Sequence, residues 1–309
     1  MVRWALLFPG QGSQFPGMGR DIFEAEPSVC DLFAHADELL GFSLSKLCFE
    51  GTEEELKRTE ITQPAILTVS SAYGAVLKAA GRKPDFVAGH SLGEYSALVF
   101  AGALSFKDAV RTVHFRGKYM QEAVPEGRGA MAAVLSDDIA VIEEGCREAS
   151  AVGVVSVANY NAPSQIVISG QKEAVDKAVE VLKAKGIRKI IPLKVSAPFH
   201  CALMEPAAVR LKAILDHIDF NNAAIPVVTN VDARPVVKGE DARDALMRQV
   251  PNPVKWIQTI EFLKSRDVAR FVEVAPGKVL SGLVSKIYPE AEVISLQDAA
   301  ALRAFVEHP

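Results

Sequence analysis

The fold is decided by the stretch DFVAGHSLGEYSALVFA, residues 85–101. A short run at Asp85–Ala88 predicts a strand, and the longer apolar run Leu92–Ala101 predicts a helix. Between them lies GHSLG, residues 89–93, a G-x-S-x-G motif in the strand–turn–helix setting that it requires. Such a turn projects a serine hydroxyl from the edge of a sheet, so we predict that Ser91 is a nucleophile. The alternative is a glycine-rich turn in which the serine is incidental.

The segments on either side of this stretch alternate between strands and helices, as in an α/β fold. Trp4–Phe8 predicts a buried strand that ends at a Pro-Gly turn, and Ile66–Ala80 and Lys107–Glu122 predict helices. The segment from residue 127 to residue 195 instead predicts the order β-α-β-β-α-β, which is the ferredoxin-like unit. Its predicted elements are strands at Ala130–Leu135, Val154–Ala158, Gln165–Ser169 and Lys189–Leu193, and helices at Asp137–Ala149 and Glu173–Lys185. We therefore expect a large α/β-hydrolase-like domain, residues 1–126 and 196–309, with a small ferredoxin-like domain, residues 127–195, inserted into it.

The composition narrows the possible partners. The chain has 309 residues, of which 49% are hydrophobic and 23% charged, and its formal net charge is −4. An acidic chain of this kind has no general attraction for nucleic acid or for anionic membranes. Four dispersed cysteines without a C-x-x-C pair favour neither a disulfide framework nor a metal site. Neither a signal peptide nor a membrane-spanning run is recognisable, so we expect a cytoplasmic protein that binds no metal.

Ser91 needs a base within hydrogen-bond reach before it can act as a nucleophile. His200 follows a predicted strand and a proline-containing loop, where active-site bases often lie, and we favour it over the five other histidines. A loop histidine without function is the alternative. The two glycines around Gln11 let the backbone approach a ligand, which favours its N–H as an oxyanion donor beside that of Leu92. A plain tight turn is the alternative for that segment.

Five segments together carry a family resemblance. They are FPGQGSQ at residues 8–14, GHSLGEY at 89–95, FRGKYMQEAVP at 115–125, VSAPFHC at 195–201 and RQVPNPVKW at 248–256. In this order and at this spacing they closely resemble the malonyl-CoA:acyl carrier protein transacylases of type II fatty acid synthesis. They are also similar to the acyltransferase domains of polyketide synthases. The resemblance covers essentially the whole chain.

The resemblance implies catalytic roles for matched positions. Ser91 is implied to be the acylated nucleophile and His200 the general base. The main-chain carbonyl of Gln249 is implied to orient that histidine in place of a carboxylate. The N–H groups of Gln11 and Leu92 are implied to form the oxyanion hole.

The resemblance also implies a substrate site. Arg116 is implied to bind the free carboxylate of a malonyl group, a task that suits a guanidinium because it forms two parallel hydrogen bonds. From the residues alone, a solvated arginine on a helix face would be the better interpretation. Gln63 and Asn159 are implied to line the site, and the bulky Phe199 resembles the malonyl-selective members rather than those that accept methylmalonyl.

The implied reaction is ping-pong transfer of malonyl from malonyl-CoA to the pantetheine thiol of acyl carrier protein, through a malonyl-serine ester. It needs no metal or redox cofactor, and we expect a monomer. Because carrier protein in this family is strongly acidic, Arg188, Lys189 and Lys194 are candidate contacts for it, with ordinary solvated charges as the alternative.

Two other functions remain open at this stage. A serine hydrolase would use the same elbow with water in place of the second thiol. Against it, no triad aspartate is evident between Ser91 and His200, and a lipase has no need for Arg116. A carrier-binding scaffold without activity is the second alternative, and the intact serine and histidine favour an enzyme instead.

Overall fold

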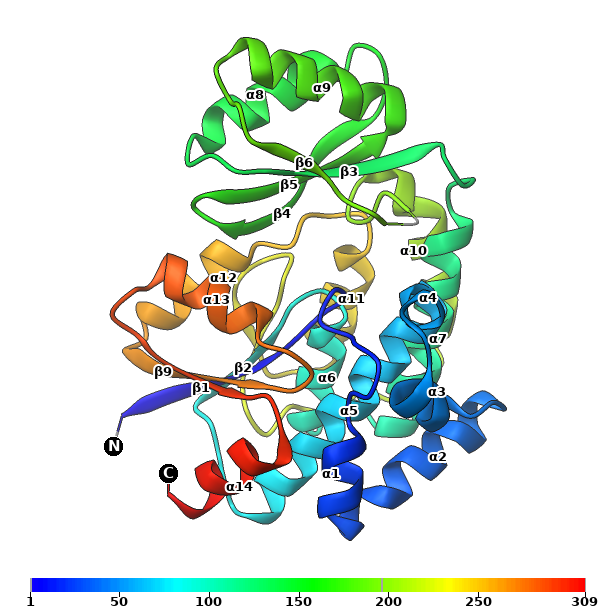
Figure 1. Ribbon diagram of the computed structural model, residues 1–309, viewed down its shortest axis with the longest axis vertical. Helices are drawn as coiled ribbons and strands as arrows, with labels where there is room; N and C mark the ends of the chain where they lie inside the picture. The colour runs from blue at the N-terminus through cyan, green and yellow to red at the C-terminus, as the bar shows by residue number, and fades with distance from the viewer. Residues whose placement is uncertain (1, 196, 309) are drawn as a thin grey trace.

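The chain folds around two β-sheets, as the ribbon diagram in Figure 1 shows. The computed structural model describes residues 2–195 and 197–308. The larger sheet lies in the lower part of Figure 1 and the smaller one in the upper part. In the described part of the chain, no helix combines the length and the apolar character needed to cross a bilayer.

The larger sheet has the strand order β10-β9-β1-β2-β7-β8. Its strands are β1 (Arg3–Phe8), β2 (Phe86–Gly89), β7 (Val227–Val228), β8 (Pro235–Val236), β9 (Val268–Val274) and β10 (Glu292–Leu296). All neighbours pair in parallel except β7 and β8. Phe8 and Gly89 are partners at the ends of β1 and β2, so the loops that follow these two strands leave the sheet side by side. In open parallel sheets, ligands bind at this carboxyl edge.

Helices cover both faces of the larger sheet. Because side chains alternate along a strand, Leu6 and Phe8 pack in one apolar cluster and Ala5 and Leu7 in another. The first cluster includes residues of α5 (Thr59–Ala79), α6 (Gly93–Phe100) and α7 (Phe106–Glu122), and the second those of α12 (Trp256–Lys264) and α13 (Val279–Ile287). The remaining helices of this part are α1 (Arg20–Ala25), α2 (Cys30–Leu40), α3 (Leu44–Glu50), α4 (Glu53–Lys57), α10 (Glu205–Leu215), α11 (Gly239–Gln249) and α14 (Ala299–Glu307), with short 3-10 turns at Pro27–Val29 and Ala202–Met204.

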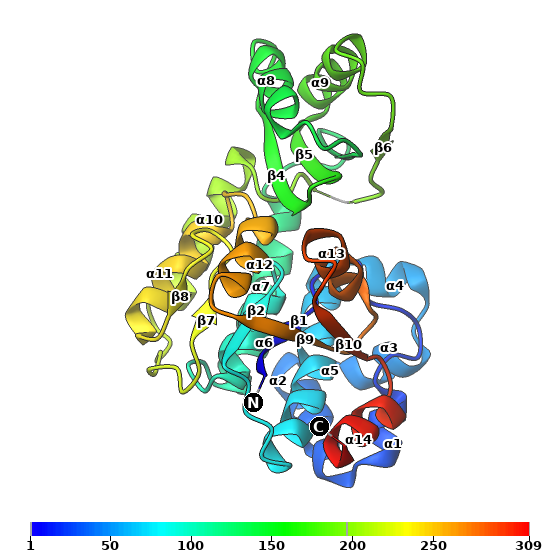
Figure 2. The ribbon, with the colours of Figure 1, turned by 90° about the vertical axis from the view of Figure 1, so that its left-hand side faces the viewer.

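The smaller sheet has the order β4-β5-β3-β6, and its neighbouring strands are antiparallel. Its elements follow the chain as β3 (Gly129–Val134), α8 (Ile139–Ala149), β4 (Val155–Ala162), β5 (Gln165–Gln171), α9 (Lys172–Ala184) and β6 (Ile190–Pro192). This is the predicted order of elements. Figures 1 and 2 show α8 and α9 on the outer face of the sheet, whose other face is turned toward the larger part. Among the described residues, one isolated bridge joins β4 to the chain before α12, from Asn159 to Val254.

One predicted helix is longer than expected. The sequence predicts a start at Ile66, whereas α5 begins at Thr59 and contains Pro64. A proline lacks the N–H that would bond the carbonyl four residues earlier, here that of Glu60. His114 Nδ1 lies 2.9 Å from the Glu60 oxygen and replaces the missing donor. His114 is therefore partly buried against α5.

Candidate active site

The elbow between β2 and α6 is built on two close backbone approaches. A Cβ at Gly89 would lie 1.9 Å from the carbonyl oxygen of Gly93, and a Cβ at Gly93 would lie 2.1 Å from that of Phe8. Neither distance leaves room for a side chain, which explains the small residues on both sides of the serine. Gly10 is equally constrained, because its Cβ would lie 2.4 Å from the His90 oxygen. The loop that carries Gln11 is thereby held against the elbow.

Ser91 and His200 meet above the carboxyl edge of the larger sheet. Ser91 Oγ lies 2.7 Å from His200 Nε2, although 109 residues separate them in the chain. His200 Nδ1 lies 3.1 Å from the carbonyl oxygens of both Gln249 and Asn252. Two carbonyls can only accept hydrogen bonds, so the ring proton resides on Nδ1 and the Nε2 lone pair faces the serine hydroxyl. The arrangement is that of a nucleophile and its base, with carbonyls in place of a triad carboxylate.

Both residues of this pair have left-handed backbones. The φ angle is 52° at Ser91 and 57° at His200. For residues other than glycine this conformation costs about 1–2 kcal/mol, and it persists where the surroundings over-determine it. Such strain is frequent at active sites.

Arg116 is a buried cation with neutral partners. It is 1% exposed, and its guanidinium donates to Gln63 Oε1 at 2.8 Å, Gln249 Oε1 at 2.9 Å and Ser91 Oγ at 3.1 Å. Among the described residues no carboxylate lies within ion-pair distance of it, although the buried Glu94 attracts it electrostatically, and its Nε has no hydrogen-bond partner. A buried unpaired charge is unfavourable unless a ligand of opposite charge completes it. This geometry suits an anionic group beside the serine.

Three residues that the sequence analysis missed support the elbow. Asn230 Oδ1 accepts from the Ser91 N–H at 2.6 Å, and its Nδ2 donates to the Gly89 oxygen at 2.6 Å. Glu94, 1% exposed, accepts from the Asn230 N–H at 2.9 Å. The third is Asn161 in β4, whose Oδ1 lies 2.8 Å from His90 Nε2. A sequence signal existed only for Asn230, which follows the end of a parallel strand, β7.

Ser91 and His200 line a cavity of about 180 Å³. Its lining includes every predicted site residue except Gln249, which lies behind the serine. The larger part of the structure contributes Gln11, Gln63, His90, Ser91, Leu92, Arg116, Met120, Phe199 and His200. The smaller sheet and the segment that follows it contribute Met131, Asn159, Asn161, Val167, Leu193 and Val195. Among the described residues, the main-chain N–H groups of Gln11 and Leu92 have no hydrogen-bond partner. Both amides are therefore available to an oxyanion.

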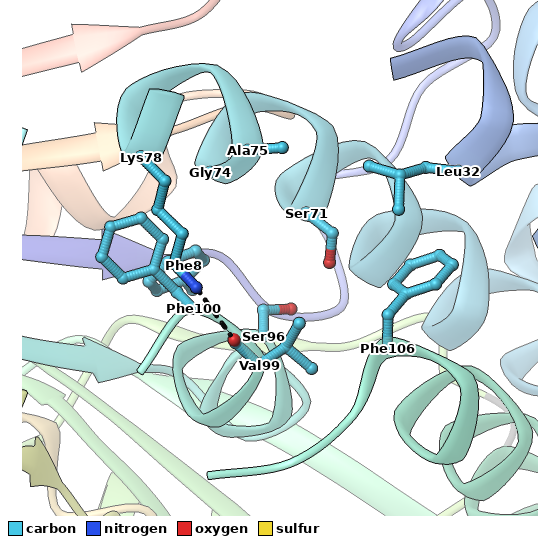
Figure 3. A pocket seen from close by; sticks show the side chains of 10 residues that line it. All are labelled: Phe8, Leu32, Ser71, Gly74, Ala75, Lys78, Ser96, Val99, Phe100 and Phe106. Carbon is cyan, nitrogen blue, oxygen red and sulfur yellow. Dashed lines mark hydrogen bonds between the residues drawn. The ribbon is translucent and has the colours of Figure 1, made fainter. Parts of the chain in front are cut away.

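A second cavity borders α6 and shares no lining residue with the first. It has about 120 Å³ and lies among α5, α6 and the end of β1 (Figure 3). The lining is mainly aliphatic and aromatic, and Lys78 is its single ionisable side chain. Figure 3 shows the hydroxyls of Ser71 and Ser96 directed into it, and neither has a hydrogen-bond partner in the part of the chain that the structure describes. Lys78 donates to the Val99 oxygen at 3.5 Å, so no described base contacts either serine and the cavity offers no activated nucleophile.

The pKa values of the buried groups reflect their surroundings. Burial, and then repulsion from Arg116, lowers the pKa of His200 to about 3. Burial raises the pKa of Glu94 to about 7, although hydrogen bonds from Asn230 and Gln249 act in the opposite direction. Burial also lowers the pKa of His90. The His200 ring is thus neutral at physiological pH and able to accept the serine proton.

We expect acylation of Ser91 to lose no rate through protonation of His200 between pH 8 and pH 5, because its folded-state pKa is about 3. The unfolded chain takes up this proton first, since its histidine has the ordinary pKa of 6.5. The contribution of His200 to stability is therefore full above that pH and is lost as the pH falls toward 3. Single-turnover acylation and urea unfolding across this range measure both effects. An acid limb near pH 6.5 that disappears in His200→Gln would contradict the lowered pKa.

Comparison with known proteins shows the family to which the chain belongs. The sequence model of the family described as acyl transferase domain matches residues 5–301. The chain is 48% identical over 308 residues to the malonyl CoA-acyl carrier protein transacylase of Escherichia coli strain K12, which covers 99% of this chain and 100% of the relative. It is 47% identical to the corresponding protein of Bacillus subtilis strain 168, with 99% and 97% covered. The chain therefore belongs to the acyltransferase family.

Solved structures place it more closely within that family. An acyl carrier protein S-malonyltransferase from Vibrio cholerae superposes with a TM-score of 0.96 at 43% identity, covering 98% of this chain and 99% of that one. A malonyl-transacylase solved with its type II polyketide acyl carrier protein gives a TM-score of 0.96 at 45% identity, with 99% and 100% covered. The chain thus falls among the malonyl-CoA:acyl carrier protein transacylases, and it is an acyltransferase.

Proposed function

We propose that the protein transfers malonyl from malonyl-CoA to the pantetheine thiol of acyl carrier protein through a malonyl ester on Ser91. The observation that carries this proposal is the buried Arg116 guanidinium, which lies 3.1 Å from Ser91 Oγ and has neutral partners alone among the described residues. An acyl group with a free carboxylate would complete that site. The names of the relatives support the donor and the acceptor.

In the first half-reaction, Ser91 Oγ attacks the thioester carbon while His200 Nε2 takes its proton. The Gln11 and Leu92 N–H groups hold the oxyanion, the C–S bond breaks, and the CoA thiolate leaves with the proton from His200. Arg116 exchanges its contact with the serine for the malonyl carboxylate. That pairing reduces its repulsion of the imidazole, so substrate binding raises the pKa of His200 and makes it a stronger base.

In the second half-reaction, His200 takes the proton from the pantetheine thiol, whose sulfur attacks the ester carbon. The C–O bond to Ser91 breaks, and the serine oxygen recovers the proton from His200. Phe199, 7% exposed, and Asn159, also 7% exposed, line the acyl cavity. We propose that the phenyl ring limits the space for a branched acyl group, a preference worth about 1–3 kcal/mol.

The two structural parts have separate places in this proposal. We assign residues 1–126 and 196–309 to a hydrolase-like catalytic domain and residues 127–195 to a ferredoxin-like domain that closes the cleft. Acyl carrier protein would approach the exposed segment that carries Arg188, Lys189 and Lys194, beside the cavity residues Leu193 and Val195. A monomer in the cytoplasm, acting without metal or redox cofactor, completes the proposal.

The deciding experiment incubates the protein with malonyl-CoA, with and without holo acyl carrier protein. We expect a malonyl mass on the protein in the first case and malonyl carrier protein in the second. Predominant release of free malonate in the presence of carrier would identify a hydrolase instead. Absence of any adduct would identify a scaffold without activity.

A further inference from the structure

Behind the nucleophile lies a buried carboxylate that takes no part in the reaction described above. Glu94 occupies the first turn of α6, three residues after Ser91, and is 1% exposed. Its Oε2 accepts two hydrogen bonds of 2.9 Å each, one from the Asn230 N–H and one from Gln249 Nε2. Burial of a carboxylate is unfavourable, so its retention needs a reason other than packing.

The two partners of Glu94 hold the strained serine from both sides. Asn230 Oδ1 accepts from the Ser91 N–H at 2.6 Å, and Gln249 Nε2 donates to the Ser91 carbonyl oxygen at 2.9 Å. The main-chain groups on either side of the left-handed Cα are thereby fixed. Asn230 Nδ2 also holds the Gly89 oxygen at 2.6 Å, two residues before the serine.

The same carboxylate acts with the Ser91 carbonyl oxygen, which accepts from the same Nε2, in determining which way the Gln249 amide faces. Because Oε2 of Glu94 already accepts from the Asn230 N–H, a proton on this carboxyl would reside on Oε1, and Oε2 selects the amide NH2 and directs Gln249 Oε1 away from itself. That oxygen accepts from Arg116 at 2.9 Å. A reversed amide would turn its NH2 toward the guanidinium, where both groups are donors.

We propose that Glu94 is a positioning residue, whose acceptor oxygen fixes Asn230 and Gln249 and through them the backbone of Ser91 and the guanidinium of Arg116. Its Oε1 has no hydrogen-bond partner among the described residues, so Oε2 makes both hydrogen bonds, and the charge of Glu94 adds an electrostatic attraction to Arg116. An amide oxygen at the same place would serve, whereas a shorter or apolar side chain would not.

Three variants separate acceptor geometry from charge. Glu94→Gln keeps an acceptor at the Oε2 position and removes the charge. Glu94→Asp keeps the charge but withdraws the oxygen by about one methylene, beyond normal hydrogen-bond length. Glu94→Leu fills the space without an acceptor. We expect Glu94→Gln to react within about tenfold of the wild type and Glu94→Asp to react more slowly than Glu94→Gln. Glu94→Leu should be slowest, at least about 100-fold below the wild type, because it loses two hydrogen bonds to a charged group.

The readout is the rate of Ser91 labelling by a fluorophosphonate probe, which reports an activated serine whatever its natural acyl group. The positioning role of Glu94 rests on the proposed function only in its effect on Arg116. Its effect on the Ser91 elbow is measured by the probe alone. A wild-type protein that reacts with the probe but transfers no malonyl would overturn the proposed function and leave the positioning role intact. Malonyl and acetyl loading are measured beside it, and Glu94→Leu should slow both.

Glu273 supplies a matched control. This carboxylate in β9 is 0% exposed and accepts two main-chain hydrogen bonds, from Leu280 at 2.9 Å and Ser281 at 2.6 Å, and among the described residues it has no hydrogen bond to the elbow. Glu273→Leu should lose stability and keep the labelling rate of the folded protein. Equal labelling by Glu94→Leu and wild type would overturn the proposal. If Glu94→Leu does not fold, the comparison of Glu94→Asp with Glu94→Gln decides. Faster labelling of Glu94→Asp than of Glu94→Gln would then overturn the positioning role.

Discussion

Ser91→Ala is expected to abolish the malonyl adduct that forms when the protein is incubated with malonyl-CoA. The hydroxyl of Ser91 lies 2.7 Å from the base, and no second serine in the described active-site cavity could replace it. Without the oxygen no ester can form, and transfer to acyl carrier protein should fall by at least about 1,000-fold, as for other nucleophiles of this kind. Intact-mass analysis and a coupled transfer assay measure the two losses.

Ser96→Ala provides the control for that substitution. Ser96 lies on α6, the helix that follows the Ser91 turn, is 1% exposed, and has a hydroxyl without a hydrogen-bond partner among the described residues. Its replacement should leave the adduct at full stoichiometry. A malonyl mass that persists in Ser91→Ala would place the ester on another residue and remove the elbow from the mechanism.

Arg116→Ala is expected to lower malonyl loading by about 100-fold and acetyl loading by less than about tenfold. The guanidinium would pair with the malonyl carboxylate, and a charge-assisted bidentate contact of this sort contributes about 3 kcal/mol. Acetyl has no carboxylate and gains nothing from it. Competition between malonyl-CoA and acetyl-CoA, with the acyl-serine read by mass, gives the ratio directly.

Arg210 is a suitable arginine for comparison, because it forms an exposed ion pair with Glu122 on the surface. Arg210→Ala should leave the malonyl-to-acetyl ratio unchanged. Arg116→Lys should retain part of the preference, since an ammonium keeps the charge but lacks the planar fork. Equal losses for both acyl groups in Arg116→Ala would exclude Arg116 from substrate selection.

Local patterns accounted for the parts of the fold that depend on neighbouring residues. The strand and helix around Ser91 could be placed because the elbow needs both within a few residues, and the β-α-β-β-α-β order could be predicted from alternating periodicities. The start of α5 was misplaced because its proline is compensated by His114, which lies 54 residues away along the chain. The sequence around Pro64 gives no sign of a hydrogen bond supplied by so distant a residue.

The site itself was less accessible from the residues alone. Spacing made His200 only the best of six histidines, and Arg116 resembled a solvated helix residue until the family resemblance was considered. Asn230 and Glu94 were not predicted because they act through hydrogen bonds between distant parts of the chain. Asn230 and Ser91 are 139 positions apart, and Asn230 and Glu94 are 136 apart. A buried network of this kind is created by the tertiary fold, and it has no periodicity to detect.

The left-handed conformation of both Ser91 and His200 has an evolutionary consequence. Glycine would adopt either backbone with ease, so a population selected for thermal tolerance alone would be free to drift toward glycine at both positions and lose the chemistry. Continued serine and histidine there would be the signature of purifying selection for turnover. Laboratory libraries screened first for heat resistance and afterwards for acylation would reveal whether that drift occurs.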